Sequence, residues 1–318
     1  MTEPIIYKLL KNNYIIDAAE NFVALSLRLE ERTNEIKILL DGEVTRIINY
    51  YGPQSFKILN EIASSPSVIV YNVYWKGISK FAIKKFKGSS SKEAIDNEIH
   101  LTQMANSHPN IIQFHGITKL RDEINYSLVL EYAEGGTLGK YLRDDTISFK
   151  WENQLKFAKE IASAVSWLHD DVGIIHGDIK KLGHNILSLR SSETQRHSYP
   201  LTEKADIYSL GVLFWELTSR KSPFDFETKN NDSLEIFKIM SKIFNGTREK
   251  PLSDTNHKFV ALYERCWQHE PHERPEIGQI ISEINNIELD NFSPKNINVS
   301  ITFTLKKNEA NEDLYLSD

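Results

Sequence analysis

The stretch that decides the fold is Ile174-Ile175-His176-Gly177-Asp178-Ile179-Lys180, followed shortly by Asn185-Ile186-Leu187. An apolar pair leads into a polar turn, and an asparagine then opens a second apolar run. Asp178 could accept the proton of a substrate hydroxyl, Lys180 could contact a phosphate, and Asn185 could bind a magnesium ion. A polar loop between two buried segments fits the same pattern, so the neighbouring stretches have to decide between the two interpretations.

The composition indicates an ordinary soluble globular protein. The 318 residues suffice for one two-lobed domain or two small ones, and they are 40% hydrophobic and 26% charged. A net charge of -6 argues against broad nucleic-acid binding. No apolar run is long enough to span a membrane, and the first residues lack a signal-type pattern. Cys266 is the single cysteine, which excludes an intramolecular disulfide and fits a reducing, cytoplasmic location.

Two predicted strands and a helix precede the stretch at residues 174–187, which we call the central loop. Residues 68–75 and 81–86 are rich in β-branched and aromatic side chains, with Lys76-Gly77 as a turn between them. A helix with an apolar face follows, and serines at 89–91 could cap it. Within these elements, Lys84 ends the string Phe81-Ala82-Ile83-Lys84, and Glu98 follows it by 14 positions.

Further stretches flank the loop on both sides. Residues 126–133 predict a strand that runs into Glu134-Gly135-Gly136, and residues 151–169 predict a long amphipathic helix. After the loop come Asp206-Ile207-Tyr208-Ser209-Leu210-Gly211-Val212-Leu213-Phe214-Trp215-Glu216-Leu217 and then Cys266-Trp267, Pro271 and Arg274-Pro275.

In this order, these motifs resemble a eukaryotic protein kinase domain over residues from about 58 to 285, most closely its tyrosine-kinase-like branch and a fungal expansion of it. The resemblance implies an α+β bilobal fold with a small β-rich lobe, a helical large lobe, and ATP as cofactor. The implied nucleotide-binding residues are Lys84, Glu98 as its ion-pair partner, Val70, and the hinge residues Glu131 and Ala133 beside the gatekeeper Leu130. The implied catalytic residues are Asp178 and Lys180, with Asn185 as a metal ligand.

The sequence departs from the kinase pattern at the phosphate-covering loop. The three glycine positions are occupied by Ala63, Ser65 and Val68, and Pro66 removes an N–H group. Glycines let the backbone approach the phosphates closely, so this loop is expected to grip them poorly.

The catalytic loop and the segment after it depart further. Gly177 replaces the usual arginine, and Asn185 follows Asp178 by seven positions instead of five. Neither Asp-Phe-Gly nor Ala-Pro-Glu is present, and Asp206 follows Asp178 by only 28 positions, against roughly 50 for a full segment. Arg274 thereby loses its usual partner, so either Glu203 substitutes or Arg274 is solvated.

The expected domain organisation has three parts. Apolar spacing predicts two or three helices within residues 1–55, with a break at Asp41-Gly42. The kinase-like domain covers 56–286, with its small lobe at 56–130 and its large lobe at 137–286. Residues 287–318 form a polar, acidic tail.

Three hypotheses for the function follow. One is a pseudokinase that binds ATP weakly and acts on protein partners as a scaffold or regulator. This hypothesis does not specify whether magnesium binds. The second is an active Ser/Thr or dual-specificity kinase with Asp178 as its base, which would need another carboxylate for the metal. The third is a truncated or spliced form of an active kinase. None of them involves a nucleic acid or a membrane.

Overall fold

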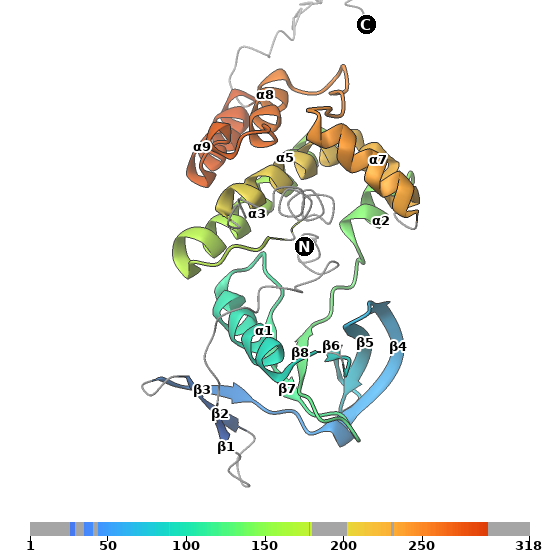
Figure 1. Cartoon of the computed structure of the whole chain (residues 1–318), viewed down its shortest axis with the longest axis vertical. Coiled ribbons are helices and arrows are strands. Elements are labelled where there is room, and N and C mark those ends of the chain that lie inside the picture. Colours follow the sequence, from blue (N-terminus) through green and yellow to red (C-terminus); the bar gives the residue numbers. More distant parts are fainter. Residues whose placement is uncertain are drawn as a thin grey trace, which may run out of the picture.

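A computed structural model describes residues 26–28, 35–40, 44–88, 90–177, 179, 202–229 and 232–291. Two lobes are evident in Figure 1, a small lobe built on a sheet and a large helical lobe. The expected bilobal kinase-like fold is therefore confirmed. Asp178, Lys180 and Asn185 lie outside the described residues, as do the N-terminal residues before 26 and the acidic tail from 292 onward.

The small lobe is a five-stranded antiparallel sheet in the order β4-β5-β6-β8-β7. Its strands are β4 (Phe56–Ser64), β5 (Val68–Trp75), β6 (Ser79–Phe86), β7 (Phe114–Thr118) and β8 (Ser127–Glu131). The strands predicted at 68–75, 81–86 and 126–133 are thus present, because their β-branched and aromatic side chains suit a half-buried pleated surface.

Helix α1 (Lys92–Met104) packs its apolar face on this sheet and is followed by the short helix η3 (Ala105–Ser107). The Ser91 side chain caps the helix by accepting a hydrogen bond from the Ala94 N–H at 3.2 Å. Ile95 and Ile99 lie buried against the sheet residues Val68 and Phe86. This packing fixes the distance between α1 and β6.

The prediction of helices in the N-terminal segment is wrong where the structure describes it. Residues there form an antiparallel sheet of β1 (Ser26–Arg28), β2 (Glu35–Leu40) and β3 (Val44–Asn49), which lies beside the small lobe (Figure 1). Short apolar runs fit helix and strand periods equally well, and Asp41-Gly42 between two β-branched runs is a hairpin signal.

The small lobe also begins earlier than the expected boundary at residue 56. Ile48 is buried in the small-lobe core, and the Tyr51 N–H donates to the Ile117 carbonyl at 2.9 Å. Thr118 Oγ1 in turn donates to the Tyr51 carbonyl at 2.7 Å. Residues 48–51 therefore join β7 to the N-terminal strands, and the short helix η2 (Pro53–Ser55) leads on to β4.

The large lobe is organised around α5, whose residues from Ala205 to Ser219 are all buried. Around it lie α2 (Leu138–Arg143), α3 (Trp151–Ser166), the π-helical turn η4 (Trp167–Val172), η5 (Pro223–Asp225), α6 (Phe226–Lys229), α7 (Ser233–Phe244), α8 (His257–Cys266), η6 (Pro271–Glu273) and α9 (Ile277–Asn291). No helix in the described ranges is long and apolar enough to cross a bilayer.

Arg274 is held in a way that the sequence did not suggest. It is 6% exposed, which contradicts the alternative that it is solvated. Its guanidinium donates to the carbonyls of Lys204, Gln268 and His269 at 2.7–2.9 Å and lies 5.1 Å from the Tyr208 ring centroid. Backbone oxygens thus satisfy the buried cation beside the start of α5.

Candidate functional site

The strand register places the predicted nucleotide-binding side chains on one face of the sheet. Val70 on β5 lies opposite Lys84 on β6, which lies opposite Leu128 on β8. Two residues along, Ala82 lies opposite Leu130. Directly opposed residues point to the same face, and so do positions two apart on a strand. Val70, Lys84 and the gatekeeper candidate Leu130 therefore share the face against which α1 packs.

Lys84 and Glu98 form the ion pair that their 14-residue spacing suggested. The Lys84 Nζ lies 2.5 Å from Glu98 Oε1, and the two side chains are 16% and 5% exposed. The packing of Ile95 and Ile99 orients the helix so that Glu98, on the same side of α1, meets the strand lysine. A lysine held in this way keeps its ammonium fixed on the face of the sheet.

In the turn between β4 and β5, the hydrogen-bonding groups of the turn residues bond to one another. The Ser65 N–H donates to the Val68 carbonyl at 2.8 Å, and the Val68 N–H donates to Ser65 Oγ at 3.0 Å. Pro66 has no N–H group. Lys87 tethers the turn from outside, because its Nζ donates to the Ser65 carbonyl at 2.5 Å. Two of the backbone donors that a phosphate would need are consequently engaged within the turn.

The segment after β8 is held to the sheet on both sides. The Glu131 N–H donates to the Gln113 carbonyl at 2.9 Å, and Glu131 Oε2 accepts from the Gln113 N–H at 3.2 Å. Lys80 Nζ lies 3.1 Å from Glu134 Oε1 and 3.8 Å from the Tyr132 ring centroid. Of the two predicted adenine-binding residues, Glu131 therefore has its N–H group engaged.

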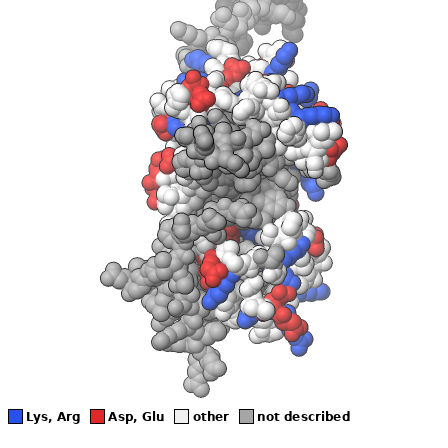
Figure 2. Space-filling model, viewed as in Figure 1, with Lys and Arg blue, Asp and Glu red and all other residues white. Residues whose placement is uncertain are grey.

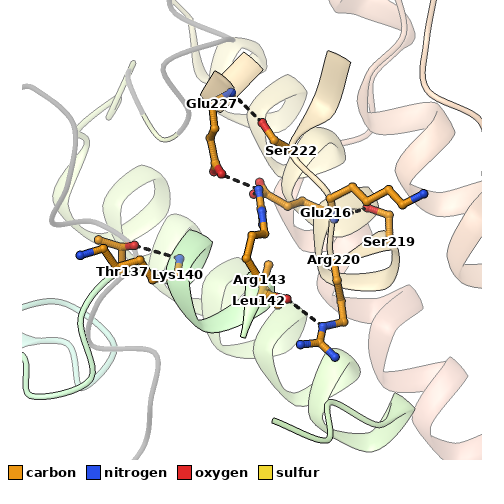
Figure 3. A network of polar contacts seen from close by, with 10 residues as sticks. Thr137, Lys140, Leu142, Arg143, Glu216, Ser219, Arg220, Ser222 and Glu227 are labelled. Carbon is orange, nitrogen blue, oxygen red and sulfur yellow. Dashed lines mark hydrogen bonds and ion pairs between the residues drawn. The ribbon is translucent and has the colours of Figure 1, made fainter. Parts of the chain in front are cut away.

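Helix α2 follows this segment, and an ionic network holds the end of α2 against α5 and α6 of the large lobe (Figure 3). Arg143 at the end of α2 lies 2.6 Å from Glu216 on α5 and 2.9 Å from Glu227 on α6. The Glu216 side chain is fully buried, so its charge requires a close cationic partner. Arg220 adds a hydrogen bond of 2.8 Å from Nε to the Leu142 carbonyl.

Asp206 at the start of α5 fixes the entry of the central loop. Its Oδ2 accepts from the His176 N–H and its Oδ1 from the Gly177 N–H, both at 2.8 Å. The buried His169 ring adds a third contact through Nε2, also at 2.8 Å. Burial lowers the pKa of His176, although the nearby Asp206 charge opposes that shift.

Gly177 has a structural reason to replace a larger residue. Its φ of +72° lies in the left-handed region, which glycine adopts without steric cost. The backbone can therefore turn directly after His176, immediately before Asp178.

Two family descriptions match the chain with a short overlap. A protein kinase domain matches residues 60–196, and a protein tyrosine and serine/threonine kinase domain matches residues 189–284. The chain belongs to the protein kinase family. Together the matches cover residues 60–284, which include the strands β5 to β8, the hinge segment, the central loop and the helices α5 to α8.

Individual relatives, two of them named as kinases and one as a receptor, agree with this family assignment. Mitogen-activated protein kinase kinase kinase 7 of Drosophila melanogaster is 27% identical over 70% of this chain and 36% of its own length. The probable serine/threonine-protein kinase drkC of Dictyostelium discoideum is 26% identical over 71% of this chain and 34% of its own length. Human atrial natriuretic peptide receptor 2 is 27% identical over 61% and 23%. The chain thus spans only about a third or less of these relatives.

Membership of the kinase family implies ATP, usually with magnesium, as cofactor. The Lys84–Glu98 pair and the hinge fit a nucleotide, whereas the β4–β5 turn offers few free donors for its phosphates. The roles of Val70, Glu131 and Ala133 remain predictions, as do those of Asp178, Lys180 and Asn185.

Three contributors to the geometry of the candidate site were not predicted from the sequence. They are Lys87, which tethers the turn, the Lys80–Glu134 contact at the hinge, and His169 beneath the loop. Of these residues, only His169 could have been recognised from the sequence, because it is a histidine on the apolar face of the helix that leads into the central loop. A lysine or glutamate contact on the surface has no sequence pattern of its own.

Proposed function

We propose that this kinase-fold protein is a pseudokinase, which binds ATP weakly, transfers no phosphate efficiently, and acts as a regulator or scaffold for other proteins. The proposal places it in the cytoplasm, supported by its single cysteine. Neither a nucleic acid nor a membrane is part of the proposal. In the view of Figure 2, acidic and basic side chains are interspersed on the described surface.

The observation that carries the proposal is the contact of Asp206 with the backbone of His176 and Gly177. Because this contact fixes both ends of the intervening segment, all that remains for metal binding and substrate docking is the sequence 178–205. That sequence contains no Asp-Phe-Gly, and its only carboxylates besides Asp178 are Glu193 and Glu203. A kinase without the magnesium aspartate loses the main electrostatic stabilisation of phosphoryl transfer.

A phosphotransfer assay with radiolabelled ATP tests this proposal. We expect no incorporation above background into generic protein substrates or the protein itself, and no difference between the parent and Asp178→Asn. Incorporation by the parent that disappears in Asp178→Asn would sink the pseudokinase proposal.

Nucleotide binding is tested separately by thermal-shift titration. The proposal predicts a small ATP-dependent rise in melting temperature that magnesium barely increases, because ligand stabilisation follows affinity. Lys84→Met should abolish the rise relative to its own unliganded baseline. A large magnesium-dependent shift would contradict the weak-binding part of the proposal.

An active Ser/Thr kinase is the second candidate, favoured by the Lys84–Glu98 ion pair. In that case another carboxylate must hold the metal, and Asp170, Asp171, Glu193 and Glu203 are the candidates in the sequence around the loop. Activity should then disappear when one of these four residues is replaced by its amide, as well as in Asp178→Asn. A spliced form of an active kinase is the third candidate. Sequencing the transcript between the codons for Leu187 and Lys204 distinguishes it from the other two.

A further inference from the structure

Helix α7 presents an apolar stripe that is largely exposed to solvent, although the Phe244 ring lies edge-on to the His269 ring at a centroid distance of 5.9 Å. Leu234, Phe237 and Phe244 are 60%, 55% and 45% exposed. Residues three, four and seven apart lie on one side of a helix, so these three side chains align with Ser241 between the phenylalanines. The buried Ile239 and Ile243 face the large-lobe core from the other side of α7.

A basic edge runs along this stripe. Lys238 and Lys242 are one turn apart on the exposed surface next to Leu234 and Ser241. Lys238 is 2.7 Å from Glu235, whereas Lys242 makes no ion pair within the described part of the chain. Basic side chains are visible on the side of the large lobe that carries α7 (Figure 2). An apolar stripe with a cationic edge suits a segment that is both apolar and acidic.

The sequence supplies such a segment at residues 309–318, which we call the acidic segment. It places Glu309, Glu312 and Asp313 directly before Leu314-Tyr315-Leu316. The 17 residues between α9 and this segment can span up to roughly 55–60 Å when extended. That reach exceeds the radius of gyration of about 15 Å for a lobe of this size, so the connection allows docking within one molecule.

We propose that the acidic segment docks on the α7 stripe of the same molecule, with Leu314, Tyr315 or Leu316 covering Phe237 and Phe244 and the carboxylates facing Lys238 and Lys242. Tethering raises the local concentration of the segment to about the millimolar range, so a weak contact is sufficient. Docking covers the stripe until a competing protein with similar chemistry displaces the segment. This inference does not depend on whether the protein transfers phosphate.

Disulfide trapping in the full chain tests the proposal. Ser241→Cys places a thiol in the stripe and Ser317→Cys places one in the acidic segment. The native Cys266 does not interfere, because it is buried and its pKa is raised to about 12 by that burial. The matched control replaces Ser241→Cys by Ser253→Cys, an exposed serine in the loop before α8.

We expect the intramolecular disulfide of the Ser241→Cys/Ser317→Cys protein to form about tenfold faster than that of the control, as measured by gel mobility under mild oxidation. Phe237→Ala, or Lys238→Glu with Lys242→Glu, should reduce the rate to that of the control. Adding Glu309→Lys and Glu312→Lys to the lysine variant should restore it. Equal rates at Ser241→Cys and Ser253→Cys would overturn the proposal, and so would a product that is mainly a disulfide-linked dimer.

Discussion

At the residue scale, Lys84 and Glu98 form an ion pair that is largely shielded from solvent. Side-chain exposures of 16% and 5% mean that each charge depends on the other, because removal of one partner leaves the second unpaired in a low-dielectric environment. Such a pair positions a cation more than it stabilises the fold, since well-packed apolar residues often serve stability equally well.

A double-mutant cycle tests that view of the pair. Lys84→Met should lower the free energy of unfolding by about 3 kcal/mol, because Glu98 remains buried without its cation. Adding Glu98→Leu should recover most of the loss. Urea denaturation of the single and double variants measures both values, and a double variant less stable than Lys84→Met would contradict the prediction.

His108 makes stability depend on pH. Burial lowers its pKa from the ordinary 6.5, with a small opposing effect from Asp171. Its Nδ1 accepts from the Asn110 N–H at 3.2 Å, so the ring must stay neutral there, and its Nε2 faces Ser163 Oγ at 3.1 Å. Below pH 6.5 the unfolded chain binds a proton before the folded chain does, so stability is complete above that pH and declines below it.

The predicted decline is at most about 1.4 kcal/mol per pH unit for each such histidine. His176, whose pKa is also lowered, should add to it. His108→Gln should flatten the dependence between pH 6.5 and 5. Urea titrations at four pH values measure the slopes, and identical slopes for the parent and His108→Gln would refute the assignment.

At the element scale, the β4–β5 turn has become a packed structural turn. Val68, at the third glycine position of the kinase loop, is 8% exposed and belongs to the small-lobe core. Ala63, at the first glycine position, is exposed. The substitution at Val68 therefore contributes apolar burial that a glycine would remove.

Restoring that glycine should harm the fold without helping nucleotide binding. Val68→Gly should lower the free energy of unfolding by about 3 kcal/mol, from lost burial and from the greater backbone entropy of glycine. ATP affinity should not rise, because Pro66 and Lys87 still hold the turn. Ala63→Gly is the matched control and should cost less than about 1 kcal/mol. A gain in ATP affinity on Val68→Gly would show that the side chain blocks the phosphates.

At the scale of the whole molecule, each lobe has its own core, and a small apolar cluster connects them. Ile111, after α1, packs with Ala164 and Leu168 of the large lobe. Nearby, Asn110 Nδ2 donates to the Glu160 carbonyl at 3.1 Å. Coupling between the two lobes on this side depends on a few contacts.

Deletion of that link should separate the unfolding of the lobes. Ile111→Ala should broaden or split the calorimetric transition, because cooperativity requires that the two cores share stabilising contacts. Ile280→Ala removes the same atoms from inside the large-lobe core and should lower the melting temperature while a single transition remains. Unchanged transition width in Ile111→Ala would show that the hinge alone couples the lobes.

Several elements follow from the sequence by itself because their signals are local. The strands β5, β6 and β8 and the helices α3 and α5 combine a clear period with kinase motifs, so both type and order are predictable. The spacing of Lys84 and Glu98 indicated their pairing through the family resemblance. The prediction for the N-terminal segment was wrong because short apolar runs fit both the helical and the strand period. Only pairing with a neighbouring strand decides between the two.

Tertiary structure decided what depends on neighbours distant in sequence. Arg274 is satisfied by carbonyls at positions 204, 268 and 269, and such partners leave no pattern in side-chain types. The pattern of α7 cannot tell which of its apolar positions the lobe will cover, so Phe237 and Phe244 are recognised as exposed only once the core is assembled. The sequence determined the protein's family and its missing catalytic motifs, because these are properties of residue identity. Burial and hydrogen-bond partners belong to the folded chain, because they arise only when distant segments meet.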